Sequence, residues 1–162
     1  MQPFAIAIFL SAFLLFQVQL LLAKYILPWF GGTPSVWPPS RLFFQTLLLA
    51  GYGYAHWLAS RPAQAVQRRF HLTILAASVV LLVSLALVWG TPLLPDSDWK
   101  PTGEEEPIGH IVLLLMASIG LPFFVLSATN PLLQAWFRHT QPASSPYRLY
   151  ALSNLGSLLG LV

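Results

Sequence analysis

The sequence predicts an all-α protein that crosses a membrane several times, a polytopic helical membrane protein. Hydrophobic residues make up 56% of its 162 residues and charged residues only 8%, against about 25% charged residues in a typical soluble domain. Several uncharged windows reach the roughly 20 apolar residues that a helix needs to cross a hydrocarbon core about 30 Å thick. The sequence contains no cysteine, so disulfide scaffolds and thiolate metal sites are both excluded.

The apolar windows predict a single membrane domain with about five transmembrane helices. The first window has no Lys or Arg before it and exceeds the roughly 7 to 15 residues of a signal-peptide core, so we expect it to be retained. The last helix has only 14 residues after Arg148, which cover roughly 21 Å. We therefore expect that helix to be truncated and the chain to be the N-terminal fragment of a longer protein. The expected transmembrane helices cover residues 3–27, 41–60, 69–90, 108–128 and 146–162.

The stretch 108–137 is too long for one transmembrane helix, because its thirty residues would extend over roughly 45 Å. Pro122 removes one backbone hydrogen bond and is expected to bend the fourth helix. Asn130 followed by Pro131 matches a helix cap with proline at the first helical position. We therefore expect a short interfacial helix at 131–138 that lies on the membrane surface.

The basic residues predict the orientation of these helices, because Lys and Arg near helix ends are retained in the cytoplasm. The second and fourth connections carry Arg61, Arg68, Arg69, Arg138 and Arg148, whereas the first and third carry Lys24, Arg41 and Lys100. This asymmetry favours a cytoplasmic N-terminus. All five acidic residues lie at positions 96–106 in the third connection; we interpret them as a solvated charge run and predict no cation site there.

A few polar side chains within the apolar windows are the candidates for intramembrane contacts. We interpret them mainly as helix-to-helix hydrogen bonds and as groups that satisfy a broken helix, with ligand binding as the alternative. For the histidine, interfacial placement is favoured over a proton relay. The candidates are Gln17, Gln45, His56, Ser127, Thr129, Asn130 and Asn154, and Asn154 is the strongest candidate for an interhelical contact.

Small residues at four-residue spacing predict close approach between helices. Gly156 and Gly160 form such a pair in the last helix, and Gly51 with Ala55 repeats the pattern in the second. These pairs suggest a packed bundle and helix–helix association through Gly156 and Gly160.

Four stretches of the sequence resemble a known family in their order and spacing. They are "LLFQVQLLLAKYILPWFGGTPSVW", "LFFQTLLLAGYGYAHWLA", "GLPFFVLSATNPLLQAWF" and "PYRLYALSNLGSLLGL". Together they resemble the N-terminal membrane region of bacterial spermidine synthase-like proteins, also described as fused major-facilitator/spermidine synthase proteins. The resemblance implies location in the bacterial inner membrane and a soluble methyltransferase-like domain further along the same polypeptide.

This chain itself is not expected to be an enzyme. Aminopropyl transfer of the kind that the resemblance implies needs a Gly-rich loop after a strand and acidic residues for the polyamine, and the sequence offers neither. We accordingly expect no catalytic residue, no cofactor site and no metal site. The expected partners are the lipid bilayer and a C-terminal domain of the same polypeptide, with no nucleic acid.

Three functional hypotheses remain open at the level of sequence. The first is a membrane module that anchors or regulates a downstream domain of a spermidine synthase-like fused protein. The second is part of a small-molecule transporter, suggested by the proline-broken fourth helix, although the helices lack the ionisable residues that ion-coupled carriers place there. The third is a structural helical bundle that assembles with a partner subunit.

Overall fold

The computed structural model describes residues 2–31, 36–95, 99–101, 107–141 and 147–162, and these residues form helices and connections with no strand. The α-helices are α1 (Gln2–Ile26), α2 (Trp37–Ala59), α3 (Gln64–Trp89), α4 (Pro107–Leu115), α5 (Leu121–Thr140) and α6 (Tyr147–Leu159). A 3-10 turn (Leu27–Phe30) follows α1, and a π-helical turn (Met116–Gly120) joins α4 to α5. The predicted all-α class is confirmed.

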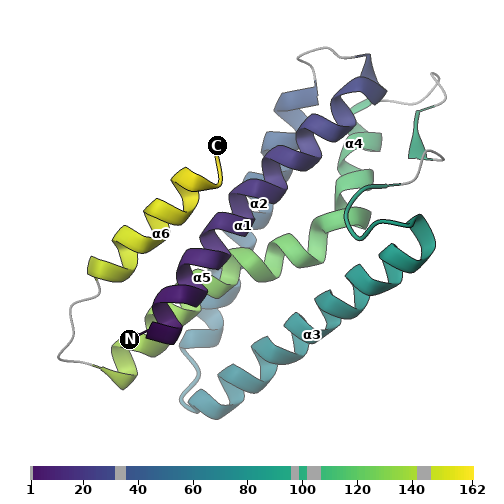
Figure 1. Ribbon diagram of the computed structural model, residues 1–162. Helices are drawn as coiled ribbons and strands as arrows, with labels where there is room; N and C mark the ends of the chain where they lie inside the picture. Colours follow the sequence, from purple (N-terminus) through teal and green to yellow (C-terminus); the bar gives the residue numbers. More distant parts are fainter. Residues whose placement is uncertain (1, 32–35, 96–98, 102–106, 142–146) are drawn as a thin grey trace.

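The long helices form a bundle in which successive segments alternate in direction (Figure 1). The largest interfaces join α2 to α5, α1 to α6 and α1 to α5, whereas α3 contacts mainly α5. The N-terminus, the connection between α2 and α3, and the end of α5 all lie at one end of the bundle. The connections after α1 and after α3 lie at the opposite end.

The largest buried apolar cluster occupies the half of the bundle nearer α4, and two smaller clusters lie toward the other end. Leu22 and Ile26 of α1 meet Phe44 of α2, Leu115 of α4 and Phe123 of α5, and each of these five side chains is almost completely buried. The rings of Phe44 and Phe123 lie 4.8 Å apart between centroids, within the range of favourable aromatic pairs. This core fixes α2 against α5 and so positions the polar side chains further along both helices.

The interruption of the fourth span lies before Pro122. The chain makes a π-helical turn over Met116–Gly120, and Pro122 then occupies the first turn of α5. Proline lacks an N–H group and its ring clashes with the carbonyl four residues earlier in a regular helix, so a local change of helix geometry ahead of it is expected. In Figure 1 the helix axis changes direction between α4 and α5.

The second expected interruption, at Asn130 and Pro131, is absent. α5 continues through Pro131 to Thr140, so the expected helix end near Ala128 and the separate helix at 131–138 are wrong. The Asn130 side chain does not cap a helix here, because it is hydrogen-bonded to α6 and to the next turn of α5. Proline within membrane helices is tolerated where neighbouring groups satisfy the backbone that it frees.

Two other helix boundaries also differ from the expected ones. α2 begins at Trp37 and α3 at Gln64, not at residues 41 and 69. Pro38 and Pro39 therefore belong to the first turn of α2, where a missing N–H costs nothing because that group would have no partner within the helix.

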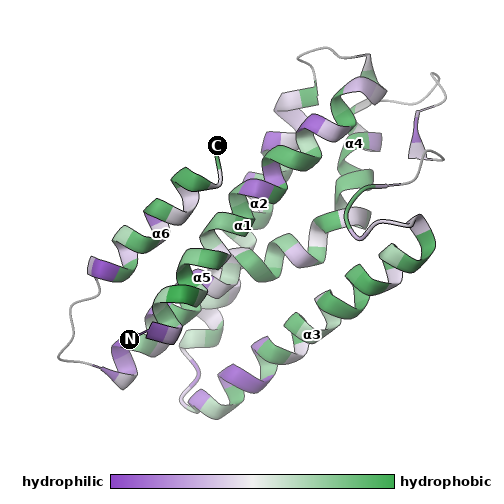
Figure 2. Cartoon of the chain, in the orientation of Figure 1, coloured by the Kyte–Doolittle hydropathy of each residue, from purple (hydrophilic) through white to green (hydrophobic). Residues whose placement is uncertain are grey.

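Three helical segments of the described chain are long and apolar enough to cross a membrane. They are Gln2–Phe30, Gln64–Trp89 and Ile108–Thr140. The other two expected spans are not among them: α2 is 23 residues long and α6 has 13 residues. α3 is hydrophobic along most of its length (Figure 2), and very little of it is buried in the bundle. These features identify an all-α helical membrane protein.

Candidate functional site

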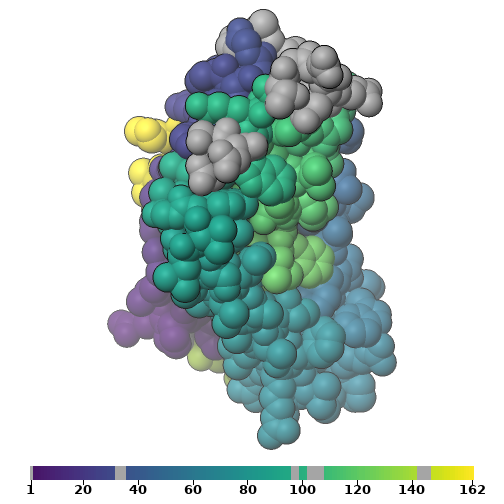
Figure 3. Space-filling model, turned by 90° about the vertical axis from the view of Figure 1, so that its right-hand side faces the viewer, coloured from purple at the N-terminus to yellow at the C-terminus, as the bar shows by residue number. Residues whose placement is uncertain are grey.

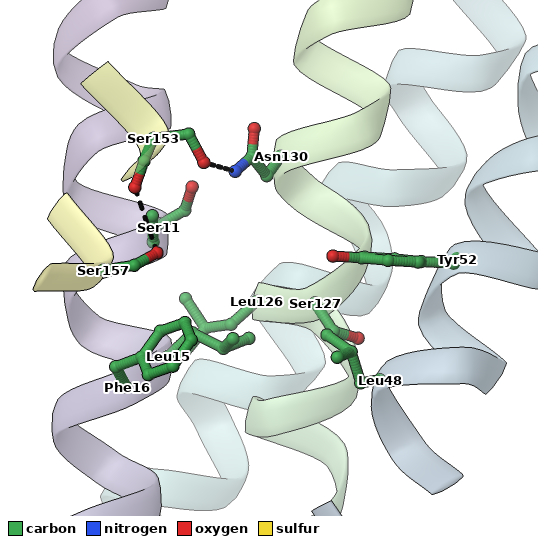
Figure 4. Close-up of a pocket in the computed structure, with 11 residues that line it drawn as sticks. Ser11, Leu15, Phe16, Leu48, Tyr52, Leu126, Ser127, Asn130, Ser153 and Ser157 are labelled. Atoms are coloured by element: carbon green, nitrogen blue, oxygen red, sulfur yellow. Dashed lines mark hydrogen bonds between the residues drawn. The ribbon is translucent and has the colours of Figure 1, made fainter. Parts of the chain in front are cut away.

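A small cavity lies where α1, α2, α5 and α6 meet (Figure 4). Its volume is about 60 Å³. That volume holds a few water molecules and is well below the roughly 300 to 1,000 Å³ of sites for metabolites and drug-sized ligands. The polar residues that line it are Ser11, Tyr52, Ser127, Asn130, Ser153 and Ser157.

Asn130 links α5 to α6 at the rim of this cavity. Its Nδ2 donates a hydrogen bond of 2.6 Å to Ser153 Oγ, and its Oδ1 accepts one of 2.8 Å from Gln134 Nε2. Figure 4 shows Asn130 and Ser153 facing each other across the gap between the two helices. The amide therefore joins two helices and bridges one turn of its own helix at the same time.

Three of the four serine hydroxyls around the cavity donate to backbone carbonyls. Ser11 Oγ donates to Ile8 O at 3.0 Å, Ser157 Oγ to Ser153 O at 3.0 Å, and Ser127 Oγ to Phe124 O at 2.7 Å. Since each hydroxyl has one hydrogen, these oxygens offer mainly lone pairs to the cavity. The wall is thus polar but neutral.

Ser127 also marks a close approach between α5 and α2. Its Oγ lies 3.4 Å from Leu47 O of α2, and Gly51 of α2 lies directly opposite it. A Cβ atom at Gly51 would overlap the Ser127 hydroxyl. The predicted close approach at Gly51 therefore corresponds to a real contact, with Ala55 buried one turn later.

A second polar group, which we call the α3 seam, joins α3 to α5 through Gln67, His71, Thr129 and Trp136. Trp136 Nε1 donates to Gln67 Oε1 at 2.7 Å, and Gln67 Nε2 donates in turn to Ala59 O and Arg61 O. The buried residues of α3 are Gln67, His71 and Ser78, so its contact with the bundle is polar although the helix is apolar.

The hydrogen bond between His71 and Thr129 defines the tautomer of the histidine. Thr129 Oγ1 donates to Val125 O at 2.7 Å, so it acts as acceptor for His71 Nε2 at 3.1 Å. His71 Nδ1 is then the bare acceptor nitrogen, and it is buried without a hydrogen-bond partner among the described residues, as is the hydroxyl of Tyr54. The two rings stack with centroids 6.0 Å apart.

The fold brings together only some of the seven polar residues that the sequence suggests for intramembrane contacts. Ser127 and Asn130 meet at the cavity, and Thr129 lies in the α3 seam. Gln45 and His56 are exposed, and Gln17 lines a separate hollow beside Lys24. Asn154, the strongest candidate for an interhelical contact, is exposed, and its neighbour Ser153 makes the bond to α5 instead.

Gly156 and Gly160 pack against α1 within the same chain. A Cβ at Gly156 would lie 2.5 Å from Phe9 O, and one at Gly160 would lie 2.8 Å from Phe13 O. The glycine face that suggested helix–helix association is thus occupied by α1, which leaves less support for a partner subunit at this face.

The residues of the α3 seam that the sequence reasoning missed are Gln67, His71 and Trp136, together with Tyr54 beside them. A signal was present, because Gln67, His71 and Ser78 recur at i, i+4 and i+11 in an apolar helix and so share one face. Their pairing with α5 could not be read from that spacing.

Replacing Asn130 by leucine is expected to loosen α6 from α5. The change removes both the bond to Ser153 and the acceptor for Gln134, and each such membrane hydrogen bond contributes about 0.6 to 2 kcal/mol. Thermal unfolding of the purified protein should show a lower Tm. Asn154→Leu is the matched control, because Asn154 is exposed and its loss should leave Tm almost unchanged. Equal effects of the two variants would contradict the assigned contact.

The pair Trp136 and Gln67 is expected to show a measurable coupling energy. Trp136→Phe removes the indole donor while keeping a ring, and Gln67→Leu removes the acceptor. A double-mutant cycle on unfolding free energy should give a coupling of about 0.5 to 1.7 kcal/mol. Simple additivity of the two single effects would mean that this hydrogen bond does not hold α3.

Among the described residues, no group of three or more His, Cys, Asp or Glu side chains is arranged to hold a metal ion. No family model matches the sequence, and neither a curated protein nor a solved structure matches it.

Proposed function

We propose that the chain is the integral membrane module of a spermidine synthase-like fused protein, in which it anchors or regulates a downstream domain and performs no catalysis itself. The resemblance of four long stretches of the sequence motivates the family. The observation that supports an anchoring role is the use of the polar side chains: Asn130, Gln67 and Trp136 all join helices to one another.

The size of the cavity also supports anchoring over transport. A solute pathway needs a site that can hold the solute. The cavity beside Asn130 has a volume of about 60 Å³ and the larger hollow beside Gln17 and Lys24 about 220 Å³, and both are below the roughly 300 to 1,000 Å³ of small-molecule sites. Three of the four serine hydroxyls around the cavity beside Asn130 donate to backbone carbonyls of their own helices. The packing of the bundle therefore supports an anchoring role over that of a solute carrier.

The proposed place is the bacterial inner membrane, with the N-terminus in the cytoplasm. Arg61, Arg68, Arg69 and Arg138 belong to the end of the bundle that also holds the N-terminus, and the positive-inside rule assigns such an end to the cytoplasm. A reporter inserted at Gly103 should accordingly give an extracytoplasmic signal.

The anchoring proposal is tested by exchanging the module. In the product of the natural gene, residues 1–162 are replaced by an unrelated anchor with the same number of spans, and the activity of the downstream domain is measured. Anchoring predicts that activity in the membrane fraction is retained. Loss of activity at equal expression and insertion would contradict it. If the reading frame of the natural gene encodes no downstream domain, the proposal that this chain belongs to a fused protein is wrong.

Part of a transporter for a neutral solute is the second candidate function. The π-helical turn at Met116–Gly120 interrupts regular helix geometry just before α5, which forms part of the cavity wall, and substrate sites of carriers often form at such interruptions. Asn130→Leu, assayed well below its lowered Tm, distinguishes the two, because a carrier should lose its cellular function while membrane insertion stays intact. An anchor should keep that function.

A further inference from the structure

The connection between α2 and α3 is a tightly bonded hairpin. Ser60 N and Arg61 N donate to His56 O and Leu58 O, each at 3.1 Å. From α3, Gln67 Nε2 reaches back to Ala59 O and to Arg61 O. Because Trp136 also donates to Gln67, the hairpin is fixed both to itself and to α5.

This hairpin presents three arginines beside two exposed aromatic rings. The guanidinium carbon of Arg61 lies 4.5 Å from the ring centroid of Trp57, a cation–π contact that holds the charge in place. Trp57 and Phe70 are each 46% exposed, and their rings meet edge to face at 6.0 Å. Arg61, Arg68 and Arg69 are all exposed. We call these five residues the arginine hairpin.

No acidic residue belongs to the helices that carry the arginine hairpin. All five acidic residues of the sequence lie at positions 96–106, in the connection between α3 and α4. That connection leaves α3 at the opposite end of the helix. The electrostatic potential at the arginine hairpin is therefore positive, and no carboxylate of α2, α3 or α5 reduces it.

The apolar surface beside the arginine hairpin indicates where its charges lie. Further along α3, Leu72, Val79 and Val80 are exposed by 57%, 52% and 64%, as expected for a side that faces lipid tails. Viewed from that side, α3 runs across the surface and the α2–α3 hairpin forms its lower end (Figure 3). Aromatic rings between an apolar face and charged residues are typical of the headgroup level of a membrane.

We propose that the arginine hairpin binds the phosphate of anionic phospholipid headgroups. Guanidinium groups bind phosphate oxygens through two parallel hydrogen bonds, and Trp57 and Phe70 sit between the headgroups and the acyl chains. A soluble acidic partner would match the charge but would leave the adjacent apolar face of α3 without a function. This lipid site does not depend on the anchoring proposal, and either can fail without the other.

The test uses the purified protein in mild detergent and a fluorescent phosphatidylglycerol as probe, with the phosphatidylcholine analogue for comparison. The protein should bind phosphatidylglycerol more tightly, and added salt should weaken the binding. Each arginine near a headgroup contributes about a fivefold change in affinity, which corresponds to about 1 kcal/mol. The variant Arg61→Gln/Arg68→Gln/Arg69→Gln should therefore bind up to about 100-fold more weakly.

The matched control removes three exposed charges from the opposite end, as Lys24→Gln/Arg41→Gln/Lys100→Gln. It has the same net charge as the first variant, and it should keep its preference for phosphatidylglycerol. Both variants should retain the helix content and Tm of the parent. Three results would overturn the proposal: no preference for phosphatidylglycerol in the parent, equal losses in both variants, or displacement of the lipid by millimolar inorganic phosphate.

Discussion

Replacing Gly51 by alanine is expected to destabilise the protein more than any other single-methyl substitution in α2. The added Cβ would overlap the Ser127 hydroxyl, and it would lie 2.9 Å from Ser127 Cβ and 3.1 Å from Phe124 O. Rotation of the serine cannot relieve the contacts with Ser127 Cβ and the Phe124 carbonyl, so α2 and α5 must separate. Overpacking of this kind costs about 1 to 3 kcal/mol or more, and thermal unfolding in detergent should show a clearly lower Tm.

Two further variants make the Gly51 prediction specific. Gly53→Ala adds the same methyl group on the same helix where no atom lies within 4 Å, so it should leave Tm unchanged or slightly raised. Ser127→Gly combined with Gly51→Ala should recover part of the lost stability, because it removes both serine atoms that the new Cβ meets. An unaltered Tm for Gly51→Ala would mean that α2 and α5 are further apart than described.

Replacing Gly156 by leucine is expected to release α6 from α1. The new Cβ would meet backbone atoms of α1, with Phe9 O at 2.5 Å and Phe13 N at 3.3 Å. Backbone cannot rotate away as a side chain can, so the interface must open. A cysteine pair at Ser11 and Ser157, which line the same cavity from α1 and α6, should be cross-linked as a disulfide under mild oxidation more readily in the parent than in the variant.

The cross-linking experiment has a clean background, because the sequence contains no cysteine. Gly109→Leu is the control, since a Cβ there meets no atom within 4 Å, and it should leave the cross-linking yield unchanged. A yield that stays high in Gly156→Leu would show that Gly156 does not form the contact between α1 and α6.

The apolar helices could be predicted from the sequence because hydropathy is a local property. A window of apolar residues needs a membrane or a core whatever its neighbours are, so the expected bounds of α1 lie within one residue of the observed ones. The expected end of α3 is equally close, but α3 starts five residues earlier than expected, at Gln64. The interruption at Pro122 was also predictable, because proline acts on its own helix. The effect of Pro131 was not, since it depends on the partner that the Asn130 side chain finds.

The polar contacts depended on helix orientation, which the sequence did not define. Ser153 and Asn154 are adjacent, and a rotation of about 100° per residue decides which of them faces α5. The larger amide was the natural candidate, but the serine makes the bond. The contact of His71 could not be predicted for a similar reason. Its partner Thr129 is 58 residues away in the sequence, and only the folded arrangement of α3 and α5 brings the two side chains together.

Cysteine accessibility in whole cells tests most directly whether this bundle lies in a membrane as described. Single cysteines are introduced at Ala63 in the α2–α3 connection, at Pro92 at the opposite end, and at Val80 on the outer face of α3, all exposed in the structure. A membrane-impermeant maleimide should label position 92 in intact cells and position 63 only after permeabilisation. Position 80 should stay unlabelled in both cases, because lipid covers it. Labelling of position 80 as fast as position 63 would contradict the placement of α3 in the membrane.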